Sequence, residues 1–266
     1  MTSVAPAISG VRDERPHVVS DALTITWRNL LNLRRNPRLL VFATIQPVVF
    51  VLMFTYVFGG AIKIPGVPYI DYLMPGIFVQ TITFGALNTG VGLADDLKKG
   101  LIERFRSLPM ARSAVLSGRT LADLFRNVFV VLLMCVVGFA VGWRISTDFA
   151  GLLAALLLLL AFAYSLSWMF GVVGLFSPDG ETAQAVSFPI LAPLVFASSA
   201  FVRPATMPSW LQGFAEHQPV SVVVDAVRAL TLGGPTASKV MAAIVWIVAI
   251  VAIFAPLAII RYRRVT

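Results

Sequence analysis

The sequence is poor in the side chains on which most enzymatic and metal chemistry depends. Its 266 residues include one cysteine, Cys135, and two histidines, His17 and His217. A lone cysteine excludes an intramolecular disulfide and a cysteine-rich metal site. A phosphate-binding loop of the form G-x-x-x-x-G-K-[ST] is also missing from the sequence. We expect this chain to bind no cofactor, and any ATP and Mg that it uses to be bound by another chain.

Charge is also scarce, and this scarcity indicates the class of protein. Only 13% of the residues are charged, 58% are hydrophobic, and the mean hydropathy is +0.85; ordinary soluble domains have about 25% charged residues. A helix needs about 20 mainly apolar residues to span a bilayer. Runs of about that length cover residues 39–59, 72–94, 121–142, 149–176, 183–201 and 240–260. We therefore expect an all-α membrane protein with about six transmembrane helices in one domain, 39–260.

The positions of the cations predict how the chain crosses the membrane. Lys and Arg in short loops stay preferentially on the cytoplasmic side. Most cations here lie before the first run (Arg12, Arg15, Arg28, Arg34, Arg35, Arg38), between the second and third (Lys98, Lys99, Arg104, Arg106, Arg112, Arg119), or after the last (Arg261, Arg263, Arg264). We therefore expect a multi-pass protein of the cytoplasmic (inner) membrane with both termini cytoplasmic. Residues 1–19 would be a disordered tail and 261–266 a second tail.

This topology also limits the ligands. His17 and His217 would lie on opposite sides of the membrane, where they cannot share a zinc ion. The net charge of +8 follows from the topology, and it favours binding to anionic lipid headgroups over binding to nucleic acid.

The segment 20–38 precedes the first run and has a helical pattern of its own. Leu23, Trp27, Leu30 and Leu31 recur at helical spacing, with arginines elsewhere around the helix. This pattern is typical of an amphipathic helix in the headgroup plane, ended by Asn36-Pro37. A solvated juxtamembrane segment is the alternative.

The connector 95–112 is the most distinctive polar segment. Its apolar side chains, Leu97, Leu101, Ile102, Phe105 and Leu108, fall on one face of a helix that contains Gly100, and charged side chains cover the rest. Such a helix can dock in a groove of a soluble partner. It can equally rest on lipid, and the pattern alone does not separate the two interpretations.

A second amphipathic region, 204–232, lies between the fifth and sixth runs. Trp210, Leu211 and Phe214 form one apolar cluster, and a second apolar face follows Pro219. We expect two short external helices here, packed on the outer ends of the spans. Asp225 and Arg228, three residues apart, are expected to form a surface ion pair.

Polar residues inside the apolar runs are the candidates for a substrate pathway, namely Gln80, Thr83, Asn88, Ser198 and Ser199. Hydrogen bonds between helices are the alternative role for most of them. The sequence places no Asp, Glu, Lys or Arg at the middle of a predicted span, with Asp123 and Arg126 close to the inner end of the third. This argues against a proton-coupled carrier and favours an apolar or amphipathic cargo.

These segments resemble the ABC-2 type permeases, in particular the branch related to daunorubicin and doxorubicin resistance. The resemblance rests on G-L-I-E-R-F-R-S-L-P-M-A-R and G-R-T-L-A-D-L-F-R in residues 100–126, and on F-V-R-P-A-T-M-P-S-W-L-Q and Q-P-V-S-V-V-V-D-A-V-R-A-L in residues 201–230. With the six spans, it covers nearly the whole chain.

The resemblance implies the membrane half of an ATP-driven exporter of drugs, lipids or polyketides. In this family two permeases, identical or sister chains, join two ATPase subunits, and the connector contributes a coupling helix. Leu101, Ile102 and Phe105 would then anchor the contact with the ATPase, and Glu103, Arg104 and Arg106 would orient it. Two other classes remain open. A stand-alone carrier or channel would work without an ATPase, and an intramembrane enzyme would need a catalytic constellation that the sequence does not show.

Overall fold

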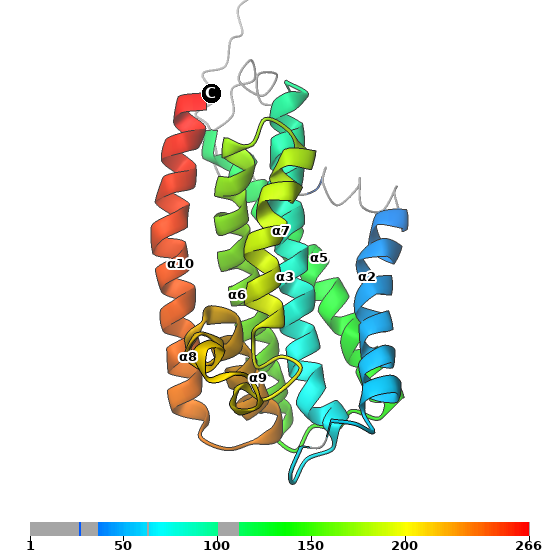
Figure 1. The fold of residues 1–266 in the computed structure, drawn as a ribbon. Helices are drawn as coiled ribbons and strands as arrows, with labels where there is room; N and C mark the ends of the chain where they lie inside the picture. Colours follow the sequence, from blue (N-terminus) through cyan, green and yellow to red (C-terminus); the bar gives the residue numbers. More distant parts are fainter. Residues whose placement is uncertain (1–26, 28–36, 63, 101–111, 266) are drawn as a thin grey trace, which may run out of the picture.

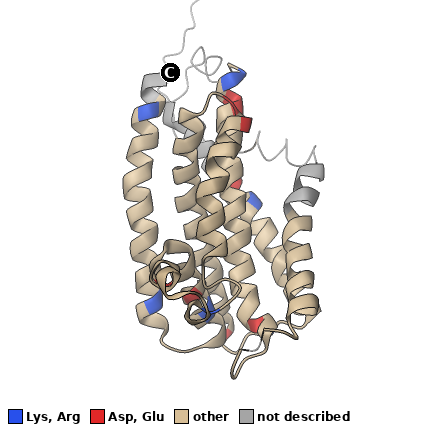
Figure 2. Cartoon of the chain, viewed as in Figure 1, with Lys and Arg blue, Asp and Glu red and all other residues tan. Residues whose placement is uncertain are grey.

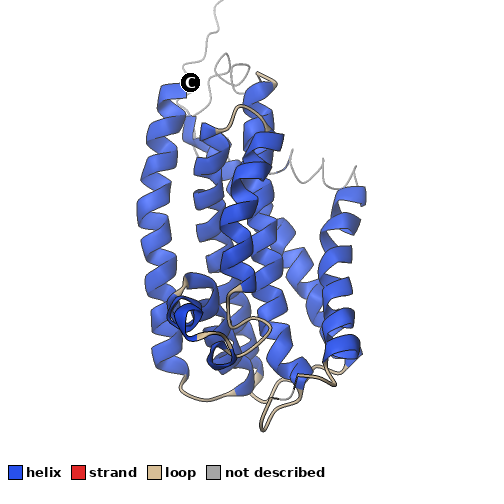
Figure 3. Ribbon diagram, in the orientation of Figure 1, coloured by secondary structure: helices blue, strands red, loops and turns tan. Residues whose placement is uncertain are grey.

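The computed structural model describes residues 27, 37–62, 64–100 and 112–265. All regular structure in these ranges is helical (Figure 3), which confirms the expected all-α class. In chain order the elements are α2 (Pro37–Leu52), the π-helix η1 (Met53–Phe58), α3 (Tyr69–Lys98), α5 (Arg112–Val141), α6 (Phe149–Phe176), α7 (Gly180–Phe196), the 3-10 helix η2 (Pro204–Thr206), α8 (Ser209–His217), α9 (Pro219–Leu232) and α10 (Thr236–Val265).

The central helix of the bundle is α3, which contacts α2, α5, α6, α7 and α9, while α10 packs against α6 and α9 (Figure 1). The short helices α8 and α9 lie together at one end of the long helices, and α3 and α10 both finish at the other (Figure 1). We call the second end the connector end, because α3 leads there into the segment 101–111. We call the first the α8–α9 end.

Within the described ranges, four helices are long and apolar enough to cross a membrane: Tyr69–Lys98, Leu121–Val141, Phe149–Phe176 and Thr236–Tyr262. They correspond to the second, third, fourth and sixth predicted spans. The first predicted span is a shorter helix, the 16 residues of α2, which continues into the π-helix η1. The fifth is α7, with 17 residues.

The helix α7 ends at Phe196, so the prediction that this span extends to residue 201 is wrong. Just beyond the helix, the Ser198 hydroxyl donates to the Val195 carbonyl at 2.6 Å and accepts from the Ala200 amide at 3.1 Å. Local bonds of this kind compete with the helical pattern of hydrogen bonds.

The outer surface of the bundle is apolar. Large side chains exposed on it include Phe125, Phe129 and Leu132 of α5 and Met241 and Val245 of α10. Charged residues gather at the two ends of the bundle, with few between them (Figure 2). Monomeric soluble proteins rarely expose apolar patches of this extent, so the surface suits a bilayer and confirms the membrane class.

The closest helix contact joins α3 to α6. At Gly90 a Cβ atom would overlap the carbonyl oxygen of Phe170, and at Gly174 it would overlap the carbonyl oxygen of Gly90. The two backbones therefore touch where side chains are missing, as in other membrane bundles with small residues at helix crossings. This contact fixes α3 against α6 in the half of the bundle nearer the connector end.

The predicted interfacial helix over 20–38 falls outside the described residues, except for Trp27, which is helical and exposed, and residues 37 and 38. Pro37 is the first residue of α2, a position that suits proline because the first helical residue needs no N–H partner.

Candidate functional site

The residues predicted to contact an ATPase lie outside the described part of the chain; they are Leu101, Ile102, Glu103, Arg104, Phe105 and Arg106. The structure does describe how the connector begins. The helix α3 continues to Lys98, and Gly100 has a φ of +63°. Glycine adopts this left-handed conformation without steric cost and commonly ends helices.

The prediction of one connector helix with Gly100 in its interior is therefore wrong. Residues 95–98 are instead the last turn of α3. Leu97, predicted on the docking face, packs within the bundle against a cluster that contains Leu93, Trp168 and Tyr262. Any docking helix in the connector has to start after Gly100.

A polar cluster at the connector end joins α3 to the start of α7; we call it the α3–α7 clamp. The Gly180 amide donates to Asp95 Oδ1 at 3.0 Å, and Lys98 Nζ lies 3.3 Å from Asp179 Oδ2. Asp179 also caps α7, because its Oδ1 accepts from the Thr182 amide at 2.8 Å. That bond and Lys98 hold the pKa of Asp179 below its ordinary value.

One face of α3 is partly exposed. Asn88 is exposed on it, with Thr81, Phe84 and Gly85 partly exposed along the same side. The Phe84 and Phe188 rings, 6.5 Å apart between centroids, line the α7 edge of this face. Exposure of a polar amide to the hydrocarbon of a bilayer costs free energy. Asn88 is therefore expected to face a polar group rather than lipid tails.

The other two polar candidates in α3 are buried. Thr83 donates to the Val79 carbonyl of its own helix at 2.6 Å. Gln80 is 2% exposed, and its Oε1 has no hydrogen-bond partner among the described residues. The structure therefore brings neither side chain to the same surface as Asn88.

Asp123 and Arg126 of α5 form an ion pair that is also hydrogen-bonded to α3. Arg126 Nη1 is 3.3 Å from Asp123 Oδ1, and Arg126 Nη2 donates to the Gly85 carbonyl at 2.8 Å. Thr89 donates to Asp123 Oδ2 at 2.6 Å. Gly85 lies near the middle of α3, and Asp123 and Arg126 lie near the start of Leu121–Val141, the candidate span of α5; that this start is the inner end stays a prediction. The helix α5 itself begins at Arg112, about three turns before Asp123.

The two opposite charges of this pair cancel, and α3 supplies partners to both. The pair therefore joins α5 to α3 and presents no net charge to a cargo.

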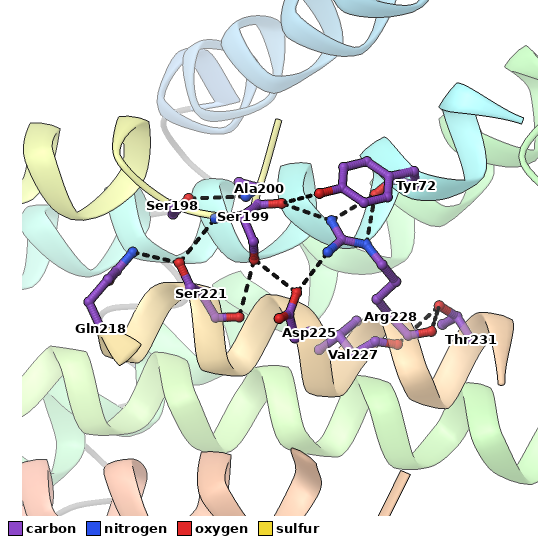
Figure 4. Close-up of polar contacts among 10 residues, drawn as sticks. All are labelled: Tyr72, Ser198, Ser199, Ala200, Gln218, Ser221, Asp225, Val227, Arg228 and Thr231. Atoms are coloured by element: carbon purple, nitrogen blue, oxygen red, sulfur yellow. Dashed lines mark hydrogen bonds and ion pairs between the residues drawn. The ribbon is translucent and has the colours of Figure 1, made fainter. Parts of the chain in front are cut away.

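Ser198 and Ser199 lie at the α8–α9 end, in a buried hydrogen-bond network drawn in Figure 4. The Ser199 amide donates to Ser221 Oγ at 3.0 Å, and the Ser199 hydroxyl donates to Asp225 Oδ1 at 2.9 Å. Each serine is 1% exposed. In this conformation both hydroxyl groups bond within the bundle, and the prediction that they contact cargo stays a prediction.

Arg228 is the centre of the same network, so the prediction that it forms a surface pair with Asp225 is wrong. Its guanidinium donates to Asp225 Oδ1 at 2.8 Å, to the Ser199 carbonyl at 2.9 Å and to the Tyr72 carbonyl at 3.0 Å. The guanidinium carbon also lies 3.6 Å from the centre of the Tyr72 ring. Arg228 thus joins α9 to α3 and to the segment that follows α7 (Figure 4).

The sequence did not reveal two of these arrangements. The contact between Asp95 and Gly180 joins residues far apart in the chain, and only the Pro178-Asp179-Gly180 turn signal hinted at a capped helix start there. The carbonyl partners of Arg228 are main-chain atoms, for which no side-chain pattern exists.

Comparison with known proteins gives consistent matches. Residues 21–232 match the family model described as ABC-2 type transporter. The daunorubicin resistance ABC transporter permease protein DrrB1 of Streptomyces coeruleorubidus is 35% identical over 256 residues, 96% of this chain and 90% of that protein. The Mycobacterium tuberculosis protein named "Probable doxorubicin resistance ABC transporter permease protein DrrC" is 28% identical over 254 residues, 92% of this chain and 89% of that protein.

Proposed function

The chain belongs to the ABC-2 type transporter family, and we propose that it is the permease subunit of an exporter driven by ATP hydrolysis on a separate ATPase chain. Its relatives are named for resistance to daunorubicin and doxorubicin. The cargo proposed here is accordingly a hydrophobic or amphipathic small molecule such as a drug, lipid or polyketide. A second permease, identical or a sister chain, would complete the membrane part.

The observation that carries the proposal is the continuity of α3. This helix runs for 30 residues to Lys98 and leads, through Gly100, directly into the charged connector. It also contacts α2, α5, α6, α7 and α9. A partner that displaces the connector therefore acts on the central helix. Movement of this helix would change the packing of its neighbours and shift the permease between its inward-facing and outward-facing conformations.

The proposed orientation places the connector end in the cytoplasm. The cations of the connector and of the C-terminal segment belong to this end, as the positive-inside tendency requires. The ATPase would then meet Leu101, Ile102, Glu103, Arg104, Phe105 and Arg106 on the side where ATP is available.

The proposed cargo path follows the partly exposed face of α3. Asn88 lies on this face, and Gln80, Thr83, Ser198 and Ser199 would become accessible only when the helices rearrange. A second permease could cover the face, which would then border a path between the two chains.

Reversal of two connector charges tests the proposal. The double change Glu103→Arg with Arg104→Glu keeps the net charge of the connector but exchanges the signs that would orient the ATPase. We expect normal insertion, loss of copurification with the ATPase, and loss of export. Normal export by a correctly inserted variant would contradict the proposal.

A further inference from the structure

We propose that Asp95 is a coupling residue that transmits movement of the connector to α7. This inference rests on the proposed function, because it needs an ATPase acting at the connector. It adds a second moving helix to the mechanism, and it concerns a positioning residue that need not touch the cargo.

The α3–α7 clamp provides the mechanical link. Asp95 lies in the last turn of α3, and its carboxylate accepts the Gly180 amide at the first residue of α7. A Cβ atom on Gly180 would lie 2.5 Å from Asp95 Oδ1, so a larger residue does not fit without a shift. The last turn of α3 and the first turn of α7 are therefore held in direct contact, just before the connector begins.

Asp95 is the stronger part of the clamp. Its carboxylate receives a charge-assisted hydrogen bond at a helix N-terminus, where the partial positive charge favours an anion. In the neighbouring ion pair with Asp179, the Lys98 side chain is 62% exposed. Exposed pairs of this kind contribute little, so removal of Asp95 should break most of the link.

The other end of α7 is fixed separately. The segment that follows it is held by Ser221, Asp225 and Arg228 of α9. Between the two attachments α7 contains Pro189 and Pro193, each of which removes a helical hydrogen bond and permits bending. Displacement of the last turn of α3 should therefore tilt the half of α7 that contains Gln184, while its far end stays on α9.

The functional test compares two substitutions at one position in the permease purified with its ATPase and reconstituted in proteoliposomes. Asp95→Ala removes the acceptor, whereas Asp95→Asn keeps an acceptor oxygen of the same length without the charge. With doxorubicin as the probe, we expect Asp95→Ala to lower export per ATP hydrolysed by about tenfold, the scale of one hydrogen bond to a charged group. Asp95→Asn should lower export per ATP hydrolysed less than Asp95→Ala does, because it keeps the acceptor oxygen and loses only the charge.

A matched control separates this role from the loss of any helix cap. Asp148 accepts the Gly151 amide at 2.8 Å at the start of α6, away from the connector. Asp148→Ala removes the same type of bond and should leave export per ATP unchanged. Gly180→Ala should reduce coupling, but it should have no further effect in an Asp95→Ala background, where the overlapping carboxylate is gone.

The decisive measurement is the distance between spin labels in a Cys135→Ser background. One label pair joins Lys99 to Leu257 and reports on the end of α3; the other joins Gln184 to Leu257 and reports on α7. Trapping with ATP and vanadate should change both distances in the unsubstituted complex and only the first in Asp95→Ala. An equal change of the α7 distance in Asp95→Ala would overturn the inference while leaving the proposed function intact. If neither distance changes in the unsubstituted complex, the proposed function fails and the inference falls with it.

Discussion

At the scale of single residues, Arg228 depends on partners that are distant in the sequence. Its spacing from Asp225 predicts a helix-surface pair. Its burial depends on the Tyr72 and Ser199 carbonyls, which lie 156 and 29 residues away in the chain. The ion pair could be predicted from the spacing of the two residues. Its buried environment could not, because main-chain acceptors have no sequence pattern.

Replacement of Arg228 should therefore be costly. Arg228→Ala leaves several buried acceptors without a donor, and we expect the free energy of unfolding in detergent micelles to fall by about 2–3 kcal/mol. Arg203→Ala, at an exposed position, is the control and should change it by less than about 0.5 kcal/mol. Equal effects of the two changes would show that the network does not hold Arg228 as described.

The lowered pKa of Asp179 should make the stability of the folded chain depend on pH. Its hydrogen bonds and Lys98 lower its pKa from 3.8, so the charged form stabilises the folded chain at pH values above 3.8. That contribution is lost as the pH falls through the lowered pKa. We expect Asp179→Asn to lower the unfolding temperature at neutral pH, and the difference from the unsubstituted chain to shrink in acid. A difference independent of pH would contradict this.

At the scale of elements, the contact between α3 and α6 depends on glycine. Gly174→Ala places a Cβ atom against the Gly90 carbonyl, and overpacking of this kind costs about 1–3 kcal/mol. Gly171→Ala is the matched control on the same helix, because a Cβ atom there meets nothing within 4 Å. Thermal unfolding in micelles should show a loss for Gly174→Ala alone.

The bounds of a helix could be predicted from the sequence where the helix has the same bounds as an apolar run. The run 149–176 has the bounds of α6, because Asp148 caps its start and Ser177 follows its end. The prediction failed where polar residues extend or stop a helix. The last turn of α3 contains Asp95 and Lys98 yet remains helical, whereas Ser198 stops α7 within an apolar run. Hydropathy measures the membrane-compatible length of a segment, and hydrogen bonding sets the helix ends.

The candidate site was predictable to a smaller extent. Asn88 could be selected because it is polar in an apolar run, and the structure shows it exposed. The same criterion selected Gln80 and Thr83, which are buried. Polarity alone does not say which side of a helix faces its neighbours, since that depends on how α2, α6 and α7 pack around α3.

At the scale of the whole molecule, two polar networks at opposite ends frame an apolar bundle. The α3–α7 clamp lies at the connector end, and the Arg228 network lies at the α8–α9 end (Figures 2 and 4). The α3–α7 clamp joins α3 to α7, and the Arg228 network joins α3 to the segment that follows α7. A force applied at the connector can therefore reach the far end through helices that are attached at both ends.

The central claim, that a separate ATPase drives this permease, is tested most directly by transport in proteoliposomes. Doxorubicin movement would be measured with the permease alone, with the permease and its ATPase, and with both in the presence of vanadate. We predict ATP-dependent movement only when both chains are present, and its loss with vanadate. Equal movement by the permease alone would contradict the account and indicate a stand-alone carrier.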